Sequence, residues 1–170
     1  MTMYRMNFLK KKFNPVKKLI TPDSYNKIIG NIWIGDKKSA FNEKFLKDKN
    51  IKLIINVTKV VDFIDNDDVI KYRIPIMDEK KKEYHDIMIN HFNEVYDLIE
   101  EYASNNKGIL IHCVSGSQRS PTLLALYLMK KNRITSKKAK KIIRKKRKIA
   151  FFLCRNFQPV LNYFDKNLDH

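Results

Sequence analysis

The chain has 170 residues, which suits a single domain with one sizeable core and excludes a tandem arrangement of ordinary domains. Its formal net charge of +17 predicts attraction to polyanions such as phosphoproteins, nucleic acid or an anionic membrane surface, although a lysine-rich solvated surface would give the same value. Two cysteines exclude a disulfide framework and no apolar run reaches the length of a membrane span, so we expect an intracellular, cytoplasmic protein in a reducing compartment.

The N-terminal two dozen residues differ from the rest of the chain. Apolar residues such as Phe8 and Phe13 alternate with basic residues before two prolines break the pattern. This pattern fits a basic amphipathic segment on an anionic surface, an arm that packs on a second subunit, or a loose strap over the protein's own core. We therefore separate residues 1–26, a basic and apolar extension, from a main domain at 27–170, and we name a homodimer through residues 1–24 as one of the three expectations.

The main domain shows apolar runs that alternate with amphipathic segments. The runs and their turn residues predict strands at 31–35, 51–57, 70–76 and 109–113, and helices at 39–50, from Tyr84 to Tyr102, from Pro121, at 137–148 and at 156–164. Strands that alternate with helices indicate an α/β fold, with a central, mostly parallel sheet of four to five strands and helices on both faces. In such a sheet, ligands bind at the carboxyl ends of the strands.

Two of the predicted helices contain residues with open roles. His85 and His91 are expected at the surface or the rim, and no His or Cys cluster has the spacing of metal ligands, so we expect a mechanism without metal or cofactor. The helix at 137–148 is strongly basic, with Ala139, Ile142 and Ile143 expected on its inner face. It forms either a solvated surface or a positive wall that contacts substrate or nucleic acid.

The most informative stretch is 108–122, where a buried strand passes through a small polar loop into a helix with proline in its first turn. The loop residues are Val114, Ser115, Gly116, Ser117 and Gln118. Small and polar residues allow successive backbone N–H groups to turn inward, and the helix adds its positive N-terminal end. The stretch therefore predicts a binding site for a tetrahedral dianion.

Four side chains around this loop have the chemistry of a nucleophilic site. The N–H groups that would hold a phosphate also favour a thiolate at Cys113. Arg119 offers a planar fork of donors for two phosphate oxygens and for a transition state. Ser120 is placed to stabilise the sulfur as a leaving group, and His112 is expected to orient the loop and tune the sulfur. A buried core cysteine is the alternative for a lone Cys, but an Arg in this position favours the functional interpretation.

These residues carry a resemblance to a known family. His112-Cys113, Gly116, Arg119-Ser120 and Pro121-Thr122 resemble the His-Cys-x5-Arg-Ser signature of cysteine-dependent phosphatases, and Arg-Ser-Pro-Thr-x-x-x-x-Tyr-Leu-Met resembles the dual-specificity branch. Ile-Trp-Ile-Gly, Ala-Phe-Asn and Ile-Ile-Asn-Val-Thr are similar to the start of that domain. The resemblance covers residue 28 to the C-terminus and suggests a small enzyme of viral, poxvirus-like type. The family's usual Pro-Asn pair is replaced by Leu153-Cys154, and Cys154 is expected in the core.

The resemblance implies a fold, a reaction and a general acid. It implies the cysteine-phosphatase fold and hydrolysis of phosphotyrosine and phosphoserine or phosphothreonine in proteins through a cysteinyl phosphate. Asp78 follows the Ile-Pro-Ile strand end where the family's general acid is placed, with Glu79 and Glu83 as rivals. An RNA 5′-phosphatase of the same superfamily and a phosphate-binding pseudophosphatase are the alternatives, and tyrosine-only specificity also stays open.

Overall fold

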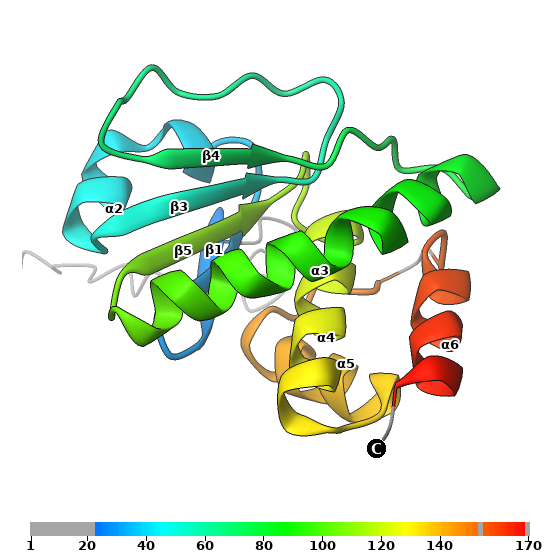
Figure 1. Cartoon of the computed structure of the whole chain (residues 1–170). Helices are drawn as coiled ribbons and strands as arrows, with labels where there is room; N and C mark the ends of the chain where they lie inside the picture. The colour runs from blue at the N-terminus through cyan, green and yellow to red at the C-terminus, as the bar shows by residue number, and fades with distance from the viewer. Residues whose placement is uncertain (1–22, 153–154, 169–170) are drawn as a thin grey trace, which may run out of the picture.

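The structure is a computed structural model that describes residues 23–152 and 155–168 (Figure 1). Its elements in chain order are β1 (Tyr25–Ile29), β2 (Ile32–Gly35), η1 (Ser39–Phe41), α2 (Glu43–Asp48), β3 (Ile51–Asn56), β4 (Ile70–Arg73), α3 (Lys82–Ser104), β5 (Gly108–His112), α4 (Arg119–Asn132), α5 (Ser136–Lys146) and α6 (Gln158–Asn167). The predicted extension at 1–22 and the predicted core position of Cys154 lie outside the described residues.

The sheet has five strands in the order β1-β2-β5-β3-β4, with β5 at its centre. Strands β2, β5, β3 and β4 run parallel, and β1 pairs antiparallel with β2. The predicted α/β fold with a mostly parallel sheet is thus confirmed. The first predicted strand, at 31–35, corresponds to β2. Strand β1 was not predicted, because it is a short edge strand whose mixed burial gives no alternating pattern. The predicted domain boundary at 26/27 falls inside β1.

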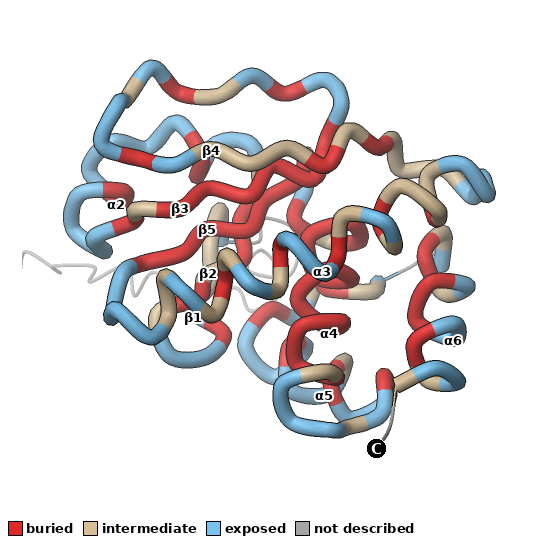
Figure 2. Tube along the Cα trace, viewed as in Figure 1, coloured by how far each residue is buried: buried red, intermediate tan, exposed pale blue. Residues whose placement is uncertain are grey.

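The two faces of the sheet are covered by different layers (Figures 1 and 2). On one face, Ile109 and Ile111 of β5 pack with α3, α4, α5 and α6 in the larger core cluster. On the other face, Leu110 packs with Phe45 of α2 and with side chains of the loop between β3 and β4. Strand β5 is therefore buried on both faces, which explains its uninterrupted apolar run. Its C-terminal end lies at the middle of the sheet and holds the loop that follows it.

Several element boundaries differ from the predicted ones for local reasons. The predicted helix at 39–50 is divided at Asn42, whose side-chain Oδ1 accepts a hydrogen bond from Phe45 N and caps α2. The predicted strand at 70–76 ends at Arg73: Ile74 N still donates to Asn56 O of β3 at 2.9 Å, but Ile76 N turns back to Ile74 O at 2.9 Å and no longer reaches β3. Ile142 is 38% exposed, so only two of the three residues assigned to the inner face of α5 are buried. His85 is buried instead of lying at the surface.

Candidate active site

Cys113 lies at the bottom of the loop that joins β5 to α4. Its side chain is fully buried, and its sulfur accepts hydrogen bonds from Gly116 N at 3.2 Å and from Ser120 Oγ at 3.4 Å. Gly116 has φ +66, and a Cβ at this position would lie 2.6 Å from the Gly35 carbonyl oxygen. Glycine has no Cβ and adopts a positive φ without strain, so it fits this position where other residues do not. Gly116 therefore fixes the turn that directs its own N–H group at the sulfur.

The loop, which we call the phosphate loop (residues 113–119), is held open from outside. The four consecutive carbonyl oxygens of residues 114–117 all accept hydrogen bonds from groups beyond the loop. The N–H and C=O of a trans peptide unit point in opposite directions, so this arrangement turns the N–H groups of residues 115–118 inward. The bonds are Lys37 N to Val114 O at 3.1 Å, Arg147 Nη2 to Ser115 O at 3.1 Å, Arg147 Nε to Gly116 O at 2.7 Å and Phe151 N to Ser117 O at 2.7 Å. The loop therefore has the inward-pointing amides that the predicted anion site requires, and binding of an anion there stays a prediction.

Arg147 was missed by the sequence analysis, which treated the basic segment at 137–148 as one surface. Its side chain is 1% exposed and lies behind the phosphate loop. Besides the two loop carbonyls, its Nη1 donates to Asp23 O at 3.0 Å and to Asn26 Oδ1 at 2.7 Å. Burial lowers the pKa of Arg147, while the negative charges of Asp36 and Cys113 oppose this change. A signal did exist: Arg147 continues at intervals of four the buried stripe of Ala139 and Ile143.

Arg119 begins α4 and is 4% exposed. Its Nη1 donates to the carbonyl oxygen of Ile76 at 3.1 Å, which fixes the plane of the guanidinium group. Its Nε is buried without a hydrogen-bond partner and lies 4.0 Å from Asp78 Oδ2. A buried N–H group without a partner is costly, and an anion in the phosphate loop would satisfy it. This geometry agrees with the predicted role of Arg119 as a phosphate-binding group.

Asp78 lies near Arg119, held by a residue distant in sequence. The side-chain amide of Asn156 donates to both the backbone oxygen and Oδ1 of Asp78, at 3.0 Å each. The two rival carboxylates take other places: Glu79 pairs with Lys81 at 2.5 Å, and Glu83 is exposed in the first turn of α3. Of the three predicted candidates, Asp78 is the one that the fold places beside the phosphate loop.

His85 and Asn156 form a pair that the sequence analysis did not predict. The His85 Nε2 lies 2.7 Å from the backbone oxygen of Asn156, and its ring packs edge-on against Phe157. The buried histidine thereby fixes the position of the residue that holds Asp78. The sequence contained only a weak signal for the buried position of His85, because a histidine near the start of an amphipathic helix is most simply a surface residue.

His112 is buried, and its Nδ1 lies 3.4 Å from the backbone oxygen of Cys113. Burial lowers the pKa of His112 to about 4, against the effect of that hydrogen bond. The ring is therefore neutral at physiological pH. Any tuning of the sulfur by His112, as predicted, has to act through loop geometry and not through a positive charge.

The outer part of the phosphate loop is exposed, with Ser115 Oγ and Ser117 Oγ 2.7 Å apart. Gln118 behaves differently from the other loop residues. Its side chain is buried and donates through Nε2 to the Phe152 carbonyl oxygen at 3.0 Å. Gln118 therefore contributes a backbone N–H to the cradle, while its amide belongs to the space between the helices.

The site can be compared with known proteins. The family model for the dual specificity phosphatase catalytic domain matches residues 32–167, which is most of the chain. The chain belongs to this family. The members of this family have the fold predicted above, and their catalytic domain is a protein phosphatase. The family, fold and enzyme-class predictions are thus confirmed. The viral, poxvirus-like type stays a prediction.

Two relatives and one solved structure illustrate the similarity. The chain is 30% identical over 120 residues to the Arabidopsis thaliana protein "Dual specificity protein phosphatase 1B", a match that spans 71% of this chain and 70% of that protein. It is 30% identical over 144 residues to the human "Dual specificity protein phosphatase 6", spanning 84% of this chain but 35% of the human protein. The crystal structure of human DUSP28 superimposes with a TM-score of 0.77 at 18% identity, covering 86% of this chain and 95% of that one.

Two negative findings concern the described residues alone. Within 23–152 and 155–168, no three His, Cys, Asp or Glu side chains gather in a group that could hold a metal ion. Over the same residues, no helix combines the length and the apolar character needed to cross a membrane.

Proposed function

We propose that the protein hydrolyses phosphotyrosine and phosphoserine or phosphothreonine side chains of proteins, with Cys113 as the nucleophile. The observation that carries this proposal is the phosphate loop: four carbonyls held outward, an N–H and a hydroxyl on the Cys113 sulfur, and the unpaired buried Nε of Arg119 beside them. An N–H cradle with a sulfur at its base and a guanidinium at its edge suits in-line attack on a phosphate monoester.

The first step forms a P–S bond and breaks the P–O bond of the ester. The Cys113 thiolate attacks phosphorus, and the departing oxygen takes a proton from Asp78. The equatorial oxygens of the transition state bind the loop N–H groups and Arg119. Asn156 keeps the Asp78 carboxyl group near the leaving oxygen, since its side-chain amide donates to both the backbone oxygen and Oδ1 of Asp78.

The second step breaks the P–S bond. Water attacks the phosphocysteine and gives its proton to Asp78, which now acts as a base. The Ser120 hydroxyl, 3.4 Å from the sulfur, donates to it as the thiolate departs. The products are inorganic phosphate and the free enzyme with its original protonation.

The test compares the wild type with Cys113→Ser on three substrates: a phosphotyrosine peptide, a phosphothreonine peptide and a 5′-triphosphate RNA. The proposal expects Cys113-dependent phosphate release from both peptides. Release from the phosphotyrosine peptide alone would restrict the enzyme to tyrosine, and release from RNA alone would make it an RNA 5′-phosphatase. Binding of phosphopeptide without release by the wild type would leave a phosphate-binding pseudophosphatase.

Further partners and the location of the protein are also proposals. The net charge of +17 supports contact with nucleic acid or an anionic membrane surface, and the apolar-basic pattern of residues 1–24 supports a homodimer. Asp23 and Ser24 are already part of the domain, because their carbonyl oxygens accept from Arg147 and Asp36 N. A chain lacking residues 1–22 that sediments as the full chain does would contradict a homodimer through residues 1–24, and unchanged vesicle binding would contradict a membrane role for that segment. A free thiol nucleophile works only when reduced, which supports an intracellular, reducing location.

A further inference from the structure

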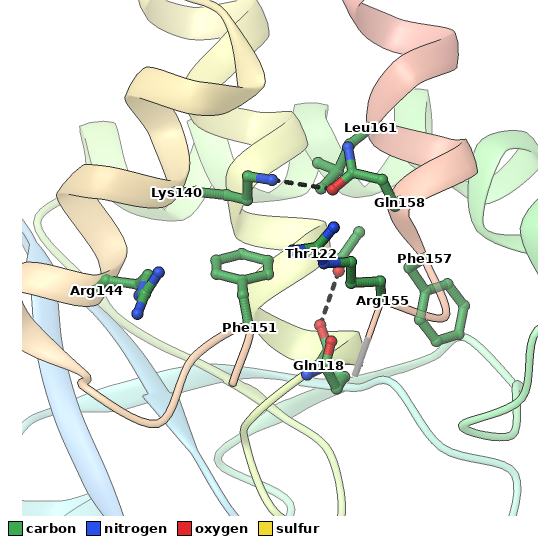
Figure 3. A pocket seen from close by; sticks show the side chains of 9 residues that line it. All are labelled: Gln118, Thr122, Lys140, Arg144, Phe151, Arg155, Phe157, Gln158 and Leu161. Carbon is green, nitrogen blue, oxygen red and sulfur yellow. Dashed lines mark hydrogen bonds between the residues drawn. The ribbon is translucent and has the colours of Figure 1, made fainter. Parts of the chain in front are cut away.

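A cavity lies between α4, α5 and α6, beside the phosphate loop (Figure 3). Its volume is about 280 Å³, room for a tetrahedral anion with several waters, each of which occupies about 30 Å³ in the liquid. Lys140 and Arg144 come from α5, Gln158 from α6, and Gln118 and Thr122 from the start of α4. Phe151, Arg155, Phe157 and Leu161 complete the wall.

The charged side chains that line this cavity are all positive. Lys140, Arg144 and Arg155 line the same space, and none of the described residues that line it is acidic. Burial and the neighbouring Arg155 lower the pKa of Lys140, with Asp165 acting in the opposite direction and Arg144 in the same one. Asp165 itself receives hydrogen bonds from Ser136 N and Oγ at the start of α5. Positive charges around one space repel one another, and a dianion between them would relieve this repulsion.

Polar groups of suitable geometry accompany the cations. The Lys140 Nζ donates to Gln158 Oε1 at 2.9 Å, which holds the ammonium group across the cavity from α5 to α6. Arg144 and Arg155 are exposed and can turn their guanidinium groups toward a ligand. Ammonium and guanidinium donors around one space are the groups that recognise phosphate.

The cavity is connected to the catalytic machinery on two sides. Phe151, in its wall, donates its N–H to the Ser117 carbonyl of the phosphate loop at 2.7 Å, and the Gln118 amide donates to Phe152 O at 3.0 Å. Arg155 directly precedes Asn156, whose side chain holds Asp78. A ligand bound by these side chains would therefore contact the supports of both the phosphate loop and the general acid.

We propose that this cavity is a second phosphate-binding site, which takes a free phosphate dianion or the phosphate of a phosphorylated side chain. The site is separate from the catalytic one, since its cations come from α5 and the segment before α6 while Cys113 and Arg119 belong to the phosphate loop. Its existence does not depend on the proposed hydrolysis, because binding alone defines it.

The test is a titration of ¹⁵N-labelled wild-type protein with inorganic phosphate, against potassium chloride of equal ionic strength. The Gly116 N–H reports the phosphate loop, and the side-chain amide of Gln158 reports the cavity. We expect both signals to move and saturate with separate dissociation constants. The triple variant Lys140→Gln, Arg144→Gln, Arg155→Gln should weaken the Gln158 titration by about tenfold or more while the Gly116 titration changes little.

A matched variant removes the same charge from exposed positions of α5: Lys137→Gln, Lys141→Gln, Lys145→Gln. It should keep both dissociation constants within about twofold, since only screened, long-range attraction is lost. A titration of Cys113→Ser protein with a doubly phosphorylated peptide then separates the two sources. Tighter saturation of Gln158 by the peptide than by phosphate assigns the site to a phosphorylated side chain, and equal saturation assigns it to free phosphate.

Three outcomes would overturn the proposal. Equal movement of Gln158 in potassium chloride would show a general salt effect. Equal weakening in the matched variant would show that net charge alone attracts phosphate. Persistence of the Gln158 movement in the triple variant, with the dissociation constant of Gly116, would show that the cavity only senses binding at the catalytic loop.

Discussion

The Nε of Arg147 donates a hydrogen bond to the carbonyl oxygen of Gly116 at 2.7 Å, while the N–H of Gly116 donates to the Cys113 sulfur at 3.2 Å. A single glycine thus connects a fully buried guanidinium group to the nucleophile. Because Arg147 also binds Ser115 O and the Asp23 carbonyl, it ties the phosphate loop to the segment before β1.

Arg147→Met keeps the side-chain length but removes every donor. We expect it to lower the free energy of unfolding by several kcal/mol, since each buried acceptor left unpaired costs about 1–3 kcal/mol. We also expect kcat to fall by about 100-fold through displacement of the loop N–H groups. Urea unfolding and aryl phosphate hydrolysis measure the two effects. Lys145→Met, exposed in the last turn of α5, is the control, and equal behaviour of the two variants would contradict the positioning role.

Asp78→Asn removes the proton donor but retains the size of the side chain. We expect kcat to fall by about 10²–10⁴-fold for aryl phosphates with poor leaving groups and far less for good ones, because only poor leaving groups need protonation. Rates across a leaving-group series measure this. Glu79→Gln, whose carboxylate pairs with Lys81, should leave the series unchanged; a flat series for Asp78→Asn would move the role to Glu79 or Glu83.

Asn156→Ala releases Asp78 from both of its hydrogen bonds with the side-chain amide. We expect about a tenfold fall in kcat for poor leaving groups, from loss of positioning worth ~1.4 kcal/mol. The same change in an Asp78→Asn background should have a much smaller effect, because the group being positioned is gone. A double-mutant cycle of kcat measures this coupling, and additive effects would contradict it.

Ser120→Ala removes the hydroxyl that donates to the sulfur at 3.4 Å. Departure of the thiolate from the phosphocysteine should slow by about tenfold, whereas the first step should change little. Rapid-quench experiments should therefore show a burst of leaving group close to one per active site, followed by slow turnover. Loss of the burst would place Ser120 in the first step instead.

The buried His112 makes stability depend on pH. Its pKa is about 4 in the folded state and 6.5 for an unperturbed histidine, so the unfolded chain binds more protons between these values. Stability is then unaffected well above pH 6.5 and falls as pH decreases toward 4, by about 2 kcal/mol between pH 7 and pH 5. Urea unfolding at both pH values measures this loss. His112→Asn should lose less stability over the same interval; an equal loss would assign it to other groups.

Cys113, Arg119 and Ser120, to which we assign the roles of nucleophile, phosphate-binding group and sulfur-stabilising hydroxyl, could be selected from the sequence because they lie within eight consecutive residues. A strand, a turn and a helix start are local structures, and the doubly buried β5 required an apolar run that the sequence shows directly. The layered sheet followed from the same alternation of apolar runs and amphipathic helices.

The tertiary structure alone decided which distant residues support that site. Arg147 lies 31 residues from Gly116 and Asn156 lies 78 from Asp78. The sequence shows that Arg147 continues a buried stripe, but it does not show which groups either residue contacts. Their roles arise from burial: a polar group enclosed by the fold must find partners, and those partners are set by packing and not by position in the chain. The sequence therefore determined the chemistry at Cys113, and packing determined how the phosphate loop and Asp78 are held.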